Sequence, residues 1–298
     1  MKRRLEISEL IFKIIAYTFL GIFSLCCLYP FVYAVSASIS GKQAVDYNKV
    51  ILLPKDVQFQ AFAKMFGNNM FWNAYTNTLF LTIFGTIWAL LVAILGGYAL
   101  SKKRLLFRKG FNFFLVFTMW FSAGMVPQYL NYLATAKAFE SVGIMDRKWL
   151  IVIAMGMAAM NVILLRNAFE GVPSEIEEAS IVDGATELQI LTKVYLPMCK
   201  STIATVTLFF AISRWNGYFW AKQMLLGEYA NEQPLQVFIR NQLDTYMDSD
   251  YMASWSQPYS HYSELYALIV CAIIPILIIY PFIQKYFAKG VNMGGVKE

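Results

Sequence analysis

The sequence has few charged residues. Aspartate, glutamate, lysine and arginine make up 15% of its 298 residues, whereas a soluble globular domain carries about 25%. Hydrophobic residues make up 58% of the chain and aromatic residues 16%. A chain of this composition cannot cover itself with a water-compatible surface. We therefore expect the lipid bilayer to be its solvent and an all-α polytopic membrane protein to be its fold.

The sequence also lacks the residues that most enzymes and metal proteins need. Its one histidine, His261, stands alone in a polar loop, and general acid–base catalysis needs a positioned partner. Cys26, Cys27, Cys199 and Cys271 show neither CxxC nor His/Cys spacing, so no disulfide framework or metal cluster follows. The phosphate-binding pattern G-x-x-x-x-G-K-[ST] is missing as well. We predict no catalytic residue, no metal site and no cofactor bound by this chain.

Six stretches are long and apolar enough to cross a bilayer, which takes about 20 residues at about 1.5 Å each. They lie near residues 11–35, 74–100, 110–132, 149–168, 201–222 and 263–284. The first stretch follows Lys2-Arg3-Arg4, but it exceeds the roughly 7–15 residues of a signal peptide's apolar part, so we predict a retained anchor. We expect one transmembrane domain over residues 1–298.

The placement of the basic residues predicts the orientation. The net charge is +6, yet lysine and arginine are not gathered in one groove, as nucleic-acid binding would require. The two termini and the segments 101–110 and 166–200 together hold 15 of them, and the alternating segments hold 9. Because cytoplasmic loops carry the excess of basic residues, we predict that both termini and the 166–200 loop are cytoplasmic.

Within that loop, residues 173–197 are predicted to form two short helices joined by a glycine hinge. Ser174 and Glu177 have the spacing of a capping box at the start of the first helix, and Thr186 and Gln189 have it at the start of the second. Gly184 suits a left-handed position after the first helix.

The second helix is expected to have one apolar stripe and a proline at its end. Leu188, Leu191 and Tyr195 recur at helical spacing. Pro197 is predicted to end the helix, because proline cannot donate a hydrogen bond to the preceding turn.

This two-helix elbow is acidic. Residues 167–192 contain no lysine or arginine, and their acidic residues are Glu170, Glu175, Glu177, Glu178, Asp183 and Glu187. An acidic and partly apolar elbow suits docking into a basic cleft of a soluble partner. The alternative is an amphipathic loop lying on the bilayer, but such helices favour lysine and arginine.

The same residues resemble the EAA motif of ABC importer permeases. Glu178-Ala179-Ser180 is followed after three residues by Gly184, and after nine more by Val194, then by Leu196-Pro197. Ser180 and Val194 depart from the usual alanine and isoleucine. We assign the ATPase-coupling surface to the EAA loop, residues 170–198. Its coupling residues are predicted to be Glu177, Glu178, Ala179, Ser180, Asp183, Gly184, Ala185, Val194, Leu196 and Pro197.

The resemblance covers nearly the whole chain. Residues 97–101, Trp215-Asn216 and the tail 289–297 are similar to segments of carbohydrate-importer permeases, the tail to the second permease subunit of maltose-type systems. Residues 121–130, FSAGMVPQYL, resemble the LplC/YtcP-like branch, which is tied to oligosaccharides released from polysaccharides.

The resemblance implies a type I ABC importer permease fold with a cytoplasmic coupling helix, in a bacterial cytoplasmic membrane. It implies that the elbow sits in a groove on a cytoplasmic ATPase. It also implies four kinds of partner: a second permease subunit, two ABC ATPase subunits, an extracytoplasmic sugar-binding protein and membrane lipid. ATP and Mg²⁺ would be bound by the ATPase subunits, so this chain is expected to be a transport subunit and not an enzyme.

Arg214 is the one charge predicted well inside a span, and such charges usually face a cavity or the bundle interior. Trp215, Asn216 and Tyr218 follow it, and aromatic faces with amides suit sugars. We predict that these four residues line the substrate pathway and that Arg214 could favour an acidic sugar. The alternative is that Arg214 braces the partner permease or snorkels, and that the aromatics form an interface belt.

Two questions stay open, namely the alternative functions of the chain and the role of one segment. A secondary, ion-coupled transporter of a small solute is the alternative, but it usually has acidic residues or histidine in its spans, and the middle of these spans has none. A second alternative is a membrane enzyme, but the nucleophile, base or metal constellation that it would need is not visible. A third is a scaffold or insertase, which the acidic elbow could also serve. The outer loop 223–262 is aromatic and either receives the external binding protein or folds onto the spans.

Overall fold

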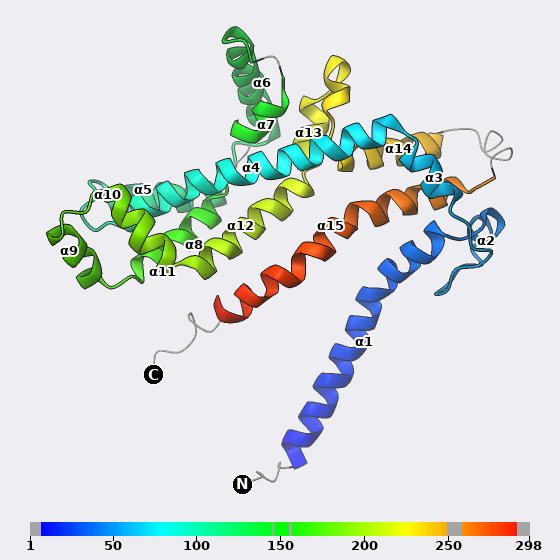
Figure 1. The fold of residues 1–298 in the computed structure, drawn as a ribbon, viewed down its shortest axis with the longest axis horizontal. Coiled ribbons are helices and arrows are strands. Elements are labelled where there is room, and N and C mark those ends of the chain that lie inside the picture. Colours follow the sequence, from blue (N-terminus) through cyan, green and yellow to red (C-terminus); the bar gives the residue numbers. More distant parts are fainter. Residues whose placement is uncertain (1–6, 145, 155–156, 249–257, 291–298) are drawn as a thin grey trace. The chain divides into compact units, whose positions relative to one another are not determined.

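The computed structural model describes residues 7–144, 146–154, 157–248 and 258–290 (Figure 1). Over these ranges the regular secondary structure is helical throughout, as the composition predicts. The chain forms two compact units, which are Met1–Phe71 with Ile239–Ile274, and Trp72–Phe238 with Pro275–Glu298. The predicted single domain over residues 1–298 stays a prediction.

The first unit contains α1 (Ile7–Ser38), α2 (Lys42–Asp46) and α3 (Gln60–Phe66), together with most of α14 (Leu235–Asp248) and the first half of α15 (His261–Gly290). The side chains of α1 are almost all exposed before Ala34, as expected of a helix that faces lipid. Its buried end packs against α15, where the rings of Tyr33 and Tyr266 meet edge to face at 5.3 Å. Nothing is described of Lys2, Arg3 and Arg4.

The second unit holds the elbow and most of the other helices. Its elements are α4 (Asn69–Ser101), α5 (Arg108–Trp120), α6 (Met125–Ser141), α7 (Lys148–Ala154), α8 (Ala159–Glu170), α9 (Ser174–Val182), α10 (Glu187–Ile190), a π-helical segment (Leu191–Tyr195), α11 (Leu196–Met198), α12 (Lys200–Trp215), α13 (Phe219–Met224) and a 3₁₀ segment (Gly227–Glu232). Figure 1 shows α4 as a long straight helix. Helix α8 packs against both α5 and α12.

Three helices in the described residues are each long and apolar enough to span a membrane: α1, α4 and the part of α15 from His261 to Pro281. Three pairs of helices reach the same criterion only together, with bends of 115° between α5 and α6, 44° between α7 and α8, and 88° between the Glu187–Met198 helix and α12. The number of spans is six if each bent pair is one span, which agrees with the prediction.

Two predicted spans have different boundaries from those expected. The stretch 110–132 is not one straight helix, because α5 ends at Trp120 and the chain turns through Gly124, whose φ is +86°. The stretch 201–222 is interrupted after Trp215, where Asn216-Gly217 separates α12 from α13. Arg214 therefore lies in the last turn of α12 and not well inside a span.

The outer loop 223–262 is also more regular than predicted, because it contains the end of α13, the 3₁₀ segment and α14. Tyr259 is buried and Tyr262 is 54% exposed. Tyr251 and Trp255 lie outside the described residues, and so does the tail 291–297 that resembles the second permease subunit. Whether this segment receives a binding protein stays a prediction.

The core of the second unit joins α4 to the elbow. Buried side chains of α4, α8, the elbow's second helix and α12 form one cluster that includes Ala93, Leu165, Ile190, Leu191 and Phe210. The backbones of α4 and α8 approach closely at Gly97, where an added Cβ would lie 3.0 Å from the Leu165 Cβ. Small residues allow such approaches between helices in a membrane. The elbow is thus packed directly onto the helix bundle.

Candidate functional site

The elbow has the glycine hinge that the sequence predicts. Gly184 adopts φ +78°, its N–H donates to the Ile181 carbonyl at 3.0 Å, and the Ala185 N–H donates to the Ser180 carbonyl at 3.0 Å. This is the Schellman pattern that ends a helix at a left-handed residue. The second predicted capping box is confirmed, because Thr186 and Gln189 satisfy each other's backbone N–H groups.

Two predictions about the elbow are wrong, and one residue of the apolar stripe lies at the surface. Ser174 makes no side-chain cap, because α9 begins at Ser174 itself after Pro173, and Glu177 turns to other partners. Leu188 is 66% exposed, whereas Leu191 and Tyr195 are buried. Pro197 does not end the helix. The π-helical segment leads directly into α11, which contains the proline and runs to Met198. That segment precedes the proline, whose missing N–H removes one helical hydrogen bond.

A buried lysine fixes the elbow to the end of α4. The Lys102 ammonium lies 2.7 Å from the Glu177 carboxylate. It also lies over two tyrosine rings, 4.2 Å from the centroid of Tyr98 and 4.0 Å from that of Tyr195. The Tyr195 hydroxyl donates a hydrogen bond to the same carboxylate. We call these four residues, Lys102, Glu177, Tyr98 and Tyr195, the lysine latch.

Two further ion pairs join the basic segment 101–110 to the elbow and to the end of α8. Arg104 pairs with Glu187, which also accepts a hydrogen bond from the Tyr98 hydroxyl at 2.9 Å, and Arg108 pairs with Glu170. Three of the six acidic residues of segment 167–192 are therefore neutralised within the chain. Sequence reasoning missed these pairs because it used the basic segment only as a topology signal. The basic segment 101–110 and the acidic segment 167–192 are predicted to lie on the same side of the membrane. Their opposite charges were the signal from which these ion pairs could have been predicted.

The remaining acidic residues share the elbow's surface with apolar side chains. Glu175, Glu178 and Asp183 are exposed, and so are Val182, at 86%, and Leu188. We call these five residues the docking face. Among the other predicted coupling residues, Ala179 and Pro197 are exposed, Ser180 donates to the Ile176 carbonyl, and Ala185, Val194 and Leu196 are half-buried against the core.

The charge of Glu177 is stable at physiological pH. Partial burial raises the pKa of its carboxyl group, but the hydrogen bonds from Lys102 and Tyr195 and the charges of Lys102 and Arg104 outweigh burial, so the pKa lies below its ordinary value. A carboxyl group with a lowered pKa stabilises the folded protein at every pH above the ordinary pKa of that group. This stabilisation is lost only as the pH falls through the lowered pKa. The latch is therefore complete at neutral pH.

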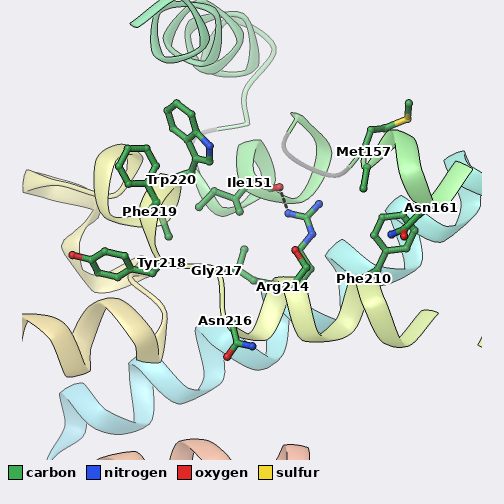
Figure 2. A pocket seen from close by; sticks show the side chains of 14 residues that line it. Ile151, Met157, Asn161, Phe210, Arg214, Asn216, Gly217, Tyr218, Phe219 and Trp220 are labelled. Carbon is green, nitrogen blue, oxygen red and sulfur yellow. Dashed lines mark hydrogen bonds between the residues drawn. The ribbon is translucent and has the colours of Figure 1, made fainter. Parts of the chain in front are cut away.

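A cavity of about 510 Å³ lies beside the end of α12 (Figure 2), within the usual size of ligand sites. Arg214, Asn216 and Tyr218 line it, as do aromatic side chains that include Trp220. Trp215 does not line this cavity, because its ring is buried against Tyr75 at 6.1 Å. The structure thus brings three of the four predicted pathway residues to one cavity.

A pair of carboxyl groups lies near the other end of α4. The backbone N–H of Lys148 donates to Asp146 at 2.9 Å and to Glu232 at 3.0 Å, and the Lys148 ammonium approaches Asn77 of α4 at 3.4 Å. Burial, and then the hydrogen bond and charge of Asp146, raise the pKa of Glu232 to about 7. The Glu232 carboxyl group is therefore partly protonated near neutral pH.

This pair predicts a pH dependence of stability. The raised pKa of the Glu232 carboxyl group links its protonation to the free energy of unfolding. The contribution of this group to stability is complete below the ordinary pKa of a glutamate and is lost as the pH rises through about 7. We expect the detergent-purified protein to lose about 1–2 kcal/mol between pH 5.5 and 8.5, after allowance for solvent screening. Melting temperatures across this range should fall, and the Glu232→Gln variant should flatten the curve. An equally steep curve in that variant would contradict the assignment.

Comparison with known proteins places the whole chain among related sequences. Residues 110–293 match the family described as "Binding-protein-dependent transport system inner membrane component". The chain is 35% identical to the polygalacturonan/rhamnogalacturonan transport system permease protein YtcP of Bacillus subtilis, over the full length of both chains. It is 31% identical to protein LplC of the same organism, over 96% of this chain and 95% of LplC.

Two solved structures are similar in fold. A chain from a bacterial ABC transporter involved in the import of the acidic polysaccharide alginate is 42% identical, with a TM-score of 0.85 over 96% of this chain and 100% of that chain. A chain from a bacterial alginate ABC transporter in complex with an alginate pentasaccharide-bound periplasmic protein gives a TM-score of 0.64 at 16% identity, over 96% of each chain. The second similarity concerns the fold alone.

Proposed function

This chain belongs to the family of binding-protein-dependent transport system inner membrane components, and we propose that it forms part of the translocation path of an ATP-driven oligosaccharide importer. Membership makes it a transport subunit and excludes the ion-coupled alternative. The observation that carries the proposal is the docking face, an exposed acidic and apolar surface on an elbow that is fixed to the helix bundle. Such an elbow can transmit a movement from a soluble partner to the spans.

The family description names only one of the partners in the assembly that we propose. A binding protein belongs to the family description. A second permease subunit and two ATPase subunits complete our proposal, with ATP and Mg²⁺ on the ATPase subunits. In this arrangement the elbow and both termini are cytoplasmic, in agreement with the excess of basic residues on that side.

The proposed mechanism is alternating access by rigid-body movement. Closure of the ATPase subunits would draw the elbows of the two permeases together. The lysine latch and the Arg104 and Arg108 ion pairs would pass this movement to α4 and α5. ATP can shift the equilibrium between inward- and outward-open states only through contacts that differ between them, and the docking face would supply those contacts.

We propose acidic oligosaccharides as the substrate class. One similar protein is named as a polygalacturonan/rhamnogalacturonan transport permease, and another belongs to a transporter described as involved in the import of the acidic polysaccharide alginate. Arg214 is the only lysine or arginine among the residues that line the described cavity, and the other lining residues there include no acidic one. A guanidinium has five N–H donors, so it can bind a sugar carboxylate while some donors are engaged elsewhere.

Uptake by the complete transporter tests this proposal. The tagged chain, purified from its native membrane in mild detergent, should bring with it an ATPase, a second permease and a binding protein. In proteoliposomes with that binding protein, we expect ATP-dependent uptake of labelled alginate or polygalacturonate pentasaccharide and at least about tenfold less maltopentaose. Uptake of the neutral sugar alone would overturn the substrate class. Purification of the chain without an ATPase, and uptake without ATP, would overturn the importer.

A further inference from the structure

The bend between α7 and α8 leaves helix carbonyls that need partners. Helix α7 has seven residues and ends at Ala154, and α8 begins at Ala159 at an angle of 44°. The last four carbonyl groups of any α-helix lack partners within the helix. In α7 these belong to residues 151–154. An unsatisfied carbonyl inside a membrane costs several kcal/mol, so a break in a span requires donors from other helices.

Side chains from two other helices supply these donors. The Arg214 guanidinium of α12 donates to the Ile151 carbonyl at 2.7 Å and to the Val152 carbonyl at 3.3 Å. The Trp88 indole of α4 donates to the Ile153 carbonyl at 3.2 Å. Three of the four carbonyls are thus satisfied. The positive charge of Arg214 also lies at the end of α7 where the helix dipole is negative.

Gly85 provides the space for this arrangement. A Cβ atom at position 85 would lie 2.9 Å from Arg214 Nε and 3.1 Å from Cδ. The guanidinium therefore rests on the bare backbone of α4, one turn before Trp88. Because its position is held by two carbonyls, the side chain cannot move aside without loss of those hydrogen bonds.

We propose that Gly85, Trp88 and Arg214 form a side-chain cap on the C-terminal carbonyls of α7, and that Arg214 thereby positions the wall of the transport cavity. Ile151, whose carbonyl accepts from Arg214, is itself a lining residue of that cavity, as is Asn161 beyond the bend (Figure 2). Arg214 is a positioning residue in this role, whatever sugar the cavity accepts. The inference goes beyond the proposed function, because it concerns how the bent span is held.

The test separates the geometry of Arg214 from its charge. Gly85→Ala keeps the arginine but removes its space, and Arg214→Lys keeps the charge but offers one ammonium in place of a planar fork. Gly96→Ala in the same helix is the matched control, since its Cβ would meet only Val162 Cγ1 at an ordinary 3.6 Å. Both glycine variants gain the same helix propensity.

Hydrogen exchange of the α7 amides, measured by mass spectrometry on the assembled transporter, is the readout that does not depend on transport. We expect Gly85→Ala and Arg214→Lys to speed exchange in residues 148–154 by about tenfold, and Gly96→Ala to leave it unchanged. Uptake of acidic and neutral pentasaccharides should fall in parallel in both variants. Wild-type exchange in Gly85→Ala and Arg214→Lys would overturn the cap, even where uptake of the acidic sugar alone is lost.

Discussion

Replacement of Lys102 by methionine should abolish most ATP-driven uptake while the transporter still assembles. Methionine fills a similar volume between Tyr98 and Tyr195 but leaves the partly buried Glu177 carboxylate without its cation. Removal of one partner from a buried ion pair costs about 3–5 kcal/mol of stability. Because Glu177 is partly exposed, we expect a cost near the lower of these values. We therefore expect the elbow to loosen and uptake to fall about tenfold or more, with less effect on ATP hydrolysis.

A double-mutant cycle checks that the effect comes from the pair. Glu177→Gln removes the unpaired charge, so the Lys102→Met, Glu177→Gln double variant should recover part of the uptake, with a coupling energy of about 1–3 kcal/mol. Lys103→Met is the matched control, because Lys103 is exposed beside the latch. Additive losses in the double variant, or an equal loss in the control, would contradict the latch. The ratio of uptake to ATP hydrolysis is the decisive measurement.

Reversal of the charge at Glu178 should detach the ATPase subunits. Glu178 is exposed on the docking face and has no ion pair among the described residues, so its substitution leaves the fold of the elbow intact. If its carboxylate meets a basic group of the partner, a like-charge contact costs several kcal/mol. We expect Glu178→Arg to reduce the co-purified ATPase and the uptake by about tenfold or more.

Glu175→Arg is the comparison for Glu178→Arg within the docking face, because Glu175 lies outside the EAA motif. It changes the net charge by the same amount in the first turn of α9, where loss of a favourable helix-dipole interaction costs about 0.3–1 kcal/mol. Uptake should then fall no more than about fivefold. Equal losses in the two variants would show that the partner senses only the overall charge of the elbow. Quantitative mass spectrometry of the purified complexes gives the ATPase ratio directly.

The parts of the elbow that sequence predicts correctly depend on local chemistry. Gly184 ends α9 because only a residue tolerant of positive φ fits there, and Thr186 with Gln189 caps the next helix within four residues. The helical class and the six apolar stretches follow from composition and length. Each of these features is decided by residues that are close together in the chain.

The parts that sequence does not predict depend on distant residues. Ser174 and Glu177 have the spacing of a capping box, but the tertiary attraction of Lys102 determines where Glu177 points. Arg214 was assigned to a span interior, whereas Asn216-Gly217 ends the helix and the arginine turns to α7. Neither partner can be identified from helical periodicity, because each lies more than sixty residues away.

The pairing of segment 101–110 with the elbow also bears on how the protein is inserted during its synthesis. Lys102, Arg104 and Arg108 leave the ribosome before Glu170, Glu177 and Glu187, because a chain is made from its N-terminus. In the orientation that we propose, their full positive charge, while still unpaired, would retain that segment on the cytoplasmic side. The later acidic residues then neutralise them. The same three cations would thus first direct membrane insertion and afterwards hold the finished elbow in place.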